Sequence, residues 1–168
     1  NKISYYEAAL IRVFCATGRR PIQISALKVK DLYVSDKYNF NDKNEVHILN
    51  IPRAKVRGAS GFRFAFSEVG IRESIAQILF EHIRILEQTL SNAIKRELLK
   101  HEVDELPLFY DLDKLTNLDW SNKKEISQIL PNEIIHLPTV QLTQKLKDAV
   151  RKLGVRSRET GDPIFVNA

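Results

Sequence analysis

The sequence predicts an α+β fold that is mainly helical, with helices packed against a small three-stranded antiparallel sheet. Apolar residues recur at intervals of three and four over 67–100 and again over 140–153, which is typical of helices that bury one face. Shorter stretches at 32–34, 46–51 and 62–66 have the apolar or alternating pattern of strands. We expect one domain, because 168 residues of which 43% are hydrophobic can bury a sizeable core.

The first helix is predicted over 5–17. Ser4 and Glu7 have the spacing of a capping box, in which each side chain accepts a hydrogen bond from the other residue's backbone N–H. Gly18 is expected to end this helix, because a residue without Cβ adopts the left-handed conformation at little cost. Cys15 lies in the apolar part of the stretch and is expected to be buried.

A second, short helix is predicted over 21–27. Pro21 suits its first turn, where the missing N–H of proline has no partner to lose. Arg20 would then lie in a tight corner beside the first N–H groups of this helix, a position that favours an anion. A guanidinium there can bind a phosphate through two hydrogen bonds, although a solvated surface charge is the simpler interpretation.

The remaining elements follow from periodicity and helix-breaking residues. We expect a hairpin between the last two strands, one or two helices over 67–100, an irregular stretch over 102–122, and one or two helical turns over 123–130. An extended connector over 134–137 leads to the last helix, over 140–153. Thr139 is its expected N-cap, and Gly154 its stop.

The charge pattern favours a nucleic-acid partner. The net charge is +5 with a pI near 9.3. Arginine and lysine concentrate at 19–30, 53–63 and 145–158. If the fold brings these three clusters to one face, they would form a positive surface suited to a phosphate backbone.

Several other classes of protein are disfavoured. No apolar run is long enough to span a membrane, and no signal-peptide pattern begins the chain, so a cytoplasmic protein without a membrane partner is expected. The four histidines have no metal-ligand spacing, and the lone cysteine cannot assist them. No phosphate-binding glycine loop occurs, so neither a metal nor a nucleotide cofactor is expected.

One motif resembles a known family. The stretch Thr17-Gly18-Arg19-Arg20, followed by Ile24, Leu27 and Asp31, is similar to the first conserved box of the tyrosine recombinases, or phage integrases. The resemblance implies that Arg20, rather than Arg19, is the first catalytic arginine of a recombinase catalytic domain. The family usually carries an acidic residue where this chain has Gln23, which can still accept a hydrogen bond.

The expected basic hairpin extends this resemblance. The family presents a lysine from a hairpin of its small sheet, and Lys55 is the best match, with Arg53 and Arg57 as alternatives. In the family this lysine is thought to protonate the leaving 5′-hydroxyl, a role that suits a flexible ammonium. The same resemblance makes Arg19, Arg53, Arg57 and Arg63 candidates for DNA contact. A solvated hairpin tip is the alternative interpretation.

The resemblance implies site-specific DNA recombination or integration. In this family a tyrosine attacks a DNA phosphodiester and forms a 3′-phosphotyrosyl bond, with no metal or nucleotide. Double-stranded DNA and further copies of the protein on that DNA are the implied partners. The second box, H-x-x-R, and the tyrosine after it do not occur, so we expect a front part of the catalytic domain that binds DNA but does not cleave it. A non-enzymatic DNA-binding module and a helical protein-binding scaffold remain as alternatives.

Overall fold

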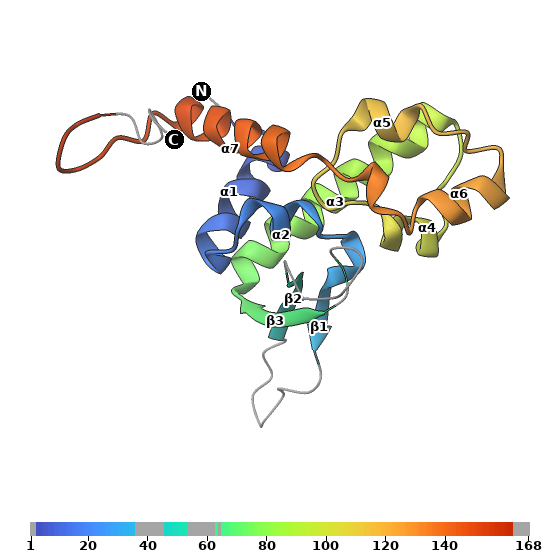
Figure 1. The fold of residues 1–168 in the computed structure, drawn as a ribbon, viewed down its shortest axis with the longest axis horizontal. Coiled ribbons are helices and arrows are strands. Elements are labelled where there is room, and N and C mark those ends of the chain that lie inside the picture. Colours follow the sequence, from blue (N-terminus) through green and yellow to red (C-terminus); the bar gives the residue numbers. More distant parts are fainter. Residues whose placement is uncertain (1–2, 36–45, 54–62, 64, 163–168) are drawn as a thin grey trace.

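The computed structural model describes residues 3–35, 46–53, 63 and 65–162, and in it the helices lie to one side of a three-stranded antiparallel sheet (Figure 1). The strands are β1 (Leu32–Ser35), β2 (Val46–Pro52) and β3 (Phe66–Ile71). The helices are α1 (Tyr5–Thr17), α2 (Pro21–Ser25), α3 (Glu73–Ile94), α4 (Lys100–Glu105), α5 (Leu112–Thr116), α6 (Lys123–Ile129) and α7 (Thr139–Leu153), with 3₁₀ turns η1 (Val29–Asp31) and η3 (Glu133–Ile135). The predicted α+β class, mainly helical with a small antiparallel sheet, is confirmed.

Helix α1 begins and ends as its sequence predicts. The Ser4 hydroxyl accepts a hydrogen bond from the Glu7 N–H at 3.2 Å, and the Glu7 carboxylate accepts one from the Ser4 N–H at 2.8 Å. Gly18 ends the helix with a φ of 58°. Cys15 is exposed, which corrects the expectation of burial, because only one face of α1 meets the core.

The sheet has the order β1-β2-β3 and places the third strand later than predicted. Leu32 pairs with Leu49, and His47 pairs with Ile71. Phe66, the last residue of the predicted strand 62–66, begins β3, whereas 67–71 was expected to be helical. Residues 66–71 instead form six antiparallel pairs with β2, and this pairing outweighs the helix-like spacing of the local sequence.

Helix α3 is one continuous helix, which ends where Lys95 adopts a φ of 58°. The stretch 102–122, predicted to be irregular, contains the end of α4 and all of α5. These helices are only six and five residues long, too short for a period to be read from their sequence. Helices α6 and α7 lie where they were predicted, with Gly154 ending α7 at a φ of 65°. Thr139 is the first residue of α7 rather than its N-cap, because the helix begins one residue earlier than predicted and Pro138 takes the N-cap position. The predicted extended connector over 134–137 begins within the 3₁₀ turn η3.

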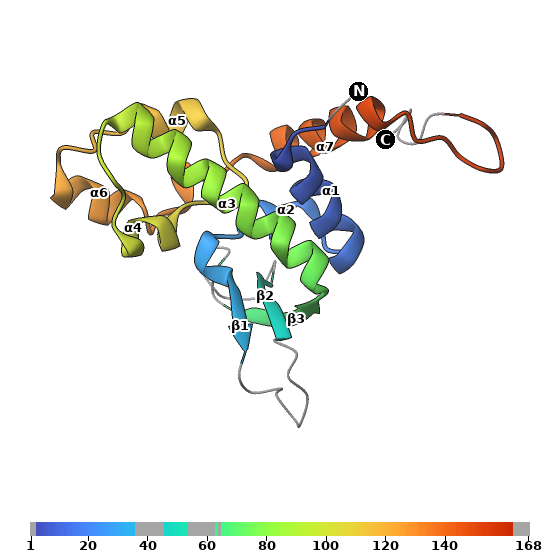
Figure 2. The ribbon, with the colours of Figure 1, turned by 180° about the vertical axis from the view of Figure 1, so that it is seen from behind.

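Helix α3 runs from the sheet to the group of α4, α5 and α6 (Figures 1 and 2) and contributes to two buried apolar clusters. Its N-terminal half packs with α1, the sheet and Leu142 of α7, around Leu10, Leu49 and Leu79. Its C-terminal half packs with α4, α5, α6 and η3, around Leu86 and Trp120. Helix α7 contacts α1 and α2, whereas α4 contacts η1, so the chain between α2 and β1 lies where the two groups of elements meet.

Two charged residues are buried in that short stretch. Lys28 is 1% exposed, and its Nζ donates to Glu105 at 2.6 Å and to the carbonyls of Leu130 and Pro131. Asp31 is 4% exposed and binds both terminal nitrogens of the Arg63 guanidinium, at 2.7 and 2.8 Å. A buried charge without a partner is costly, so both ion pairs constrain the fold.

We predict that Asp31→Ala lowers the free energy of unfolding by about 3–5 kcal/mol, because it leaves the mostly buried Arg63 guanidinium unpaired. Urea denaturation measures this loss. Asp148→Ala is the matched control, since its pair with Arg151 is about half exposed and should contribute less than about 1 kcal/mol. Equal effects of the two substitutions would contradict the structural role of Asp31.

Candidate nucleic-acid interface

Arg20 lies at the N-terminus of α2, as the sequence predicted. It is the N-cap residue of that helix, with extended backbone, and its side chain is exposed. No carboxylate of the described residues forms an ion pair with Arg20. Its neighbour Arg19 is half-buried, and within the described part of the chain the Nε of Arg19 has no hydrogen-bond partner. Arg20 therefore keeps hydrogen-bonding capacity for an anion, whereas the Nε of Arg19 is buried.

Other residues of the family-like box have structural roles. Ile24 and Leu27 are fully buried in the cluster shared with the sheet. Asp31 accepts the Arg63 guanidinium and also the Lys28 N–H, at 2.7 Å. These residues hold α2 and η1 in position, which in turn positions Arg20.

Gln23 connects the start of α2 to the sheet. Its Nε2 donates to the carbonyl of Pro52, the last residue of β2, at 2.9 Å. Its Oε1 accepts from the backbone N–H of Arg20 at 3.4 Å. The side chain that replaces the usual acidic residue thus contacts the backbone of Arg20 and the end of β2, which no sequence pattern indicated.

The second basic cluster divides into residues with different roles. Arg53 follows β2 and is exposed, and its Nε donates to the Ser67 hydroxyl at 2.9 Å. Arg63 donates to the Ala26 carbonyl at 2.6 Å and to Asp31, so its guanidinium already binds within the fold. Lys55 and Arg57 lie outside the described residues, so their predicted roles stay predictions.

Arg19, Arg20 and Arg53 define what we call the arginine surface, joined by α2 and the end of β2. The basic cluster 19–30 contributes less positive charge to this surface than its sequence suggests, because Lys28 and Lys30 both bind Glu105. The Glu105 carboxylate is partly buried, which alone would raise its pKa, but hydrogen bonds from the two lysines lower that pKa below its usual value.

The third basic cluster lies on and after α7, beside α1 and α2. Lys152 pairs with Glu7 of α1, and the Lys145 ammonium lies 5.3 Å from the centre of the Tyr6 ring. In both views α2 lies between α7 and β2 (Figures 1 and 2). The first basic cluster therefore includes α2 itself, the third lies partly on α7, which contacts α2, and Arg53 of the second directly follows β2, which also contacts α2.

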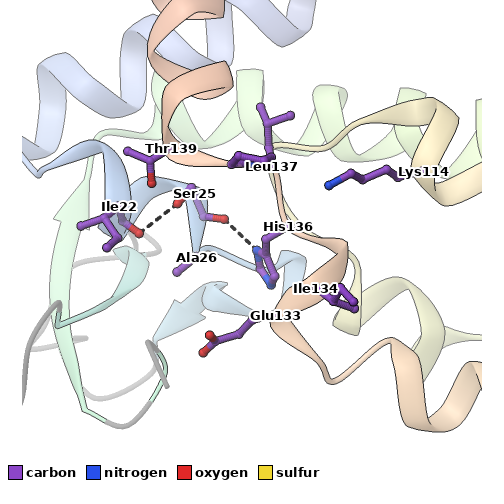
Figure 3. Close-up of a pocket in the computed structure, with 10 residues that line it drawn as sticks. Ile22, Ser25, Ala26, Lys114, Glu133, Ile134, His136, Leu137 and Thr139 are labelled. Carbon is purple, nitrogen blue, oxygen red and sulfur yellow. Dashed lines mark hydrogen bonds between the residues drawn. The ribbon is translucent and has the colours of Figure 1, made fainter. Parts of the chain in front are cut away.

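A pocket of about 270 Å³ lies beside α2, lined by Ser25, Ala26, Ile134 and His136 among others (Figure 3). His136 Nδ1 lies 2.7 Å from the Ser25 carbonyl, which can only accept, so the proton is on Nδ1 and Nε2 is an acceptor. This Nε2 is buried without a partner in the described part of the molecule. Burial lowers the pKa of His136 to about 4, and the nearby positive charges of Lys28 and Arg63 act in the same direction.

Residues considered for other chemistry are engaged elsewhere. The acidic residues between 104 and 111 have structural partners: Asp104 pairs with Lys100, Glu105 binds Lys28 and Lys30, and Asp111 caps α5. Among the residues that the structure describes, no group of three or more His, Cys, Asp or Glu could hold a metal ion. Within the same residues, no helix is long and apolar enough to cross a membrane.

Comparison with models of protein families, with curated proteins and with solved structures found no match to this chain. The arrangement of the arginine surface therefore carries the functional interpretation, together with the motif resemblance.

We predict that stability decreases as the pH falls from about 6.5 to about 4. Over this range His136 becomes protonated in the unfolded state but stays neutral in the folded state. Its contribution to the free energy of unfolding is therefore complete above pH 6.5 and is lost as the pH falls toward 4. The contribution is about 3 kcal/mol, at about 1.4 kcal/mol per pKa unit. Buried His82 has a lowered pKa for the same reason and adds to the effect.

Urea denaturation across this pH range tests the assignment. His136→Asn should flatten the pH dependence, and His101→Asn, which changes an exposed histidine in the same way, is the matched control. An unchanged slope in His136→Asn would show that another group is responsible.

Proposed function

We propose that this chain is the front part of a tyrosine recombinase catalytic domain and that its arginine surface binds the phosphate backbone of duplex DNA. In the complete protein, this surface would help to cleave and rejoin DNA through a phosphotyrosyl intermediate, as site-specific recombination or integration requires. Arg20 would stabilise the negative charge that develops on the phosphate, and Lys55 would supply the proton to the leaving 5′-hydroxyl.

The position of Arg20 is the observation that carries this proposal. Arg20 is exposed at the N-cap of α2, with no carboxylate partner among the residues that the structure describes. Gln23 connects this helix to β2, the strand that precedes the segment containing Lys55. The other end of that segment is tied to the same region, because Arg63 donates to Ala26 and Asp31. Pro52 and Arg63, which the structure describes on either side of 54–62, thus both form hydrogen bonds with the α2–η1 stretch that carries the recombinase-like box.

We predict that the chain binds duplex DNA at low salt, without sequence preference, and that Arg20→Ala weakens this binding. Each phosphate contact contributes about −0.9 to the slope of log K against log salt, so the slope should become shallower by about that amount. Titrating a fluorescent duplex at several salt concentrations measures it. The control is Arg84→Ala, which removes another exposed arginine, on α3, where it pairs with Glu81. This variant should leave the salt slope near that of the unchanged chain.

The outcome also separates the alternatives. Equal slopes for the two variants would remove Arg20 from the interface. Failure to bind DNA even at low salt would overturn the proposal and favour a protein-binding scaffold.

Cleavage is tested in a longer protein that supplies the H-x-x-R and tyrosine segments. Arg20→Ala should fold but lose the covalent DNA adduct by about a hundredfold or more, the usual cost of removing one charge-stabilising group. Lys55→Ala should slow cleavage, and an unchanged rate would transfer its role to Arg53 or Arg57. A near-normal adduct in Arg20→Ala, or a complete protein without those segments, would favour the non-enzymatic DNA-binding module.

A further inference from the structure

The two hydrogen bonds of Gln23 require a side chain that both donates and accepts. Its Nε2 faces the Pro52 carbonyl, which can only accept, and its Oε1 faces the Arg20 N–H, which can only donate. Among side chains of this length, a neutral amide meets both demands at neutral pH, whereas a carboxylate offers acceptors alone. A glutamate here would place negative charge against the Pro52 carbonyl oxygen.

Gln23 also lies between two members of the arginine surface. Arg20 precedes it by three residues, and Arg53 follows Pro52 directly. The position of Arg53 is further held by its backbone N–H, which donates to the Ala65 carbonyl at 2.7 Å, and by its Nε, which donates to Ser67. Arg20 lies at the start of α2, and Arg53 follows the last residue of β2. The Gln23 side chain hydrogen-bonds to the backbone at both places, and so it connects α2 to the sheet.

We propose that Gln23 is a positioning residue that holds Arg20 and Arg53 in one relative geometry for phosphate binding, and that its amide is required because the partner on β2 is a carbonyl. This inference rests on the proposed DNA binding by the arginine surface. It also accounts for the absence of the usual acidic residue from this chain: the end of β2 offers an acceptor at that position, and only a donor can bind it.

The test compares Gln23→Met and Gln23→Glu with the unchanged chain in the DNA titration. The methionine is neutral and of similar length but has no donor, so it should weaken binding about fivefold, as expected for one lost hydrogen bond of about 1 kcal/mol. It should also reduce the salt slope toward that of Arg20→Ala. The double variant with Arg20→Ala should then bind no more weakly than Arg20→Ala alone, because the lost contact is the same.

The glutamate variant adds a pH readout. A carboxyl group facing a carbonyl can donate only when protonated, so Gln23→Glu should bind weakly at pH 8 and approach the unchanged chain as the pH falls toward 5. Gln23→Met should stay weak throughout. A role confined to the stability of the fold would lower the urea midpoint but leave the salt slope unchanged and show no rescue of DNA binding at low pH.

The outcomes separate this inference from the function on which it rests. If the unchanged chain binds DNA and Arg20→Ala weakens it, but Gln23→Met binds with normal affinity and slope, Gln23 has no positioning role. If Gln23→Glu recovers DNA binding at low pH but Gln23→Met binds normally at every pH, the added negative charge caused the weaker binding of Gln23→Glu. This result would also overturn the inference. If the unchanged chain does not bind DNA at low salt, the proposed function itself is wrong.

Discussion

The burial of charge between α2 and β1 is the constraint on which much of this structure depends. Lys28 and Asp31 lie three residues apart and are almost inaccessible to water, so each needs a partner that its own neighbourhood cannot provide. Glu105 and Arg63 supply them from 77 and 32 residues further along the chain. Such pairs add little net stability over apolar packing, but they exclude arrangements that leave a charge unpaired. They therefore define how the α4–α6 group and Arg63 are placed against the chain between α2 and β1.

This constraint also decides which basic residues remain for a ligand. Charge clusters in the sequence do not distinguish a lysine that neutralises a buried carboxylate from an arginine that faces solvent. The structure separates them. Lys28, Lys30 and Arg63 bind carboxylates within the fold, whereas Arg20 is exposed at the start of α2 and Arg53 is exposed just after the end of β2. Net positive charge alone would have overstated the interface, because part of it is used to satisfy buried anions.

Local chemistry explains where sequence interpretation succeeded. The capping box at Ser4, the left-handed glycines at 18 and 154 and the proline at the start of α2 act through their own backbone or that of residues within one turn. The position of Arg20 at a helix N-terminus follows from those signals. Strand β3 was misplaced because its pairing with β2, across a connection of more than ten residues, is a tertiary interaction. The exposure of Cys15 likewise depends on which face of α1 meets the core.

The sequence by itself thus determined the helix boundaries near residue 20 and the α+β composition, because capping residues and the local pattern of apolar residues indicate them. The recombinase-like box was also visible, since it is a pattern of neighbouring residues. Only the tertiary structure decided that Gln23 reaches Pro52, that Asp31 holds Arg63 and that His136 donates to a carbonyl 111 residues away. Those contacts depend on which distant backbone groups each side chain meets after the two apolar clusters form. A hydrogen-bonding side chain carries no local mark of its distant partner, so the residue that joins the arginine surface could not be identified before the fold was known.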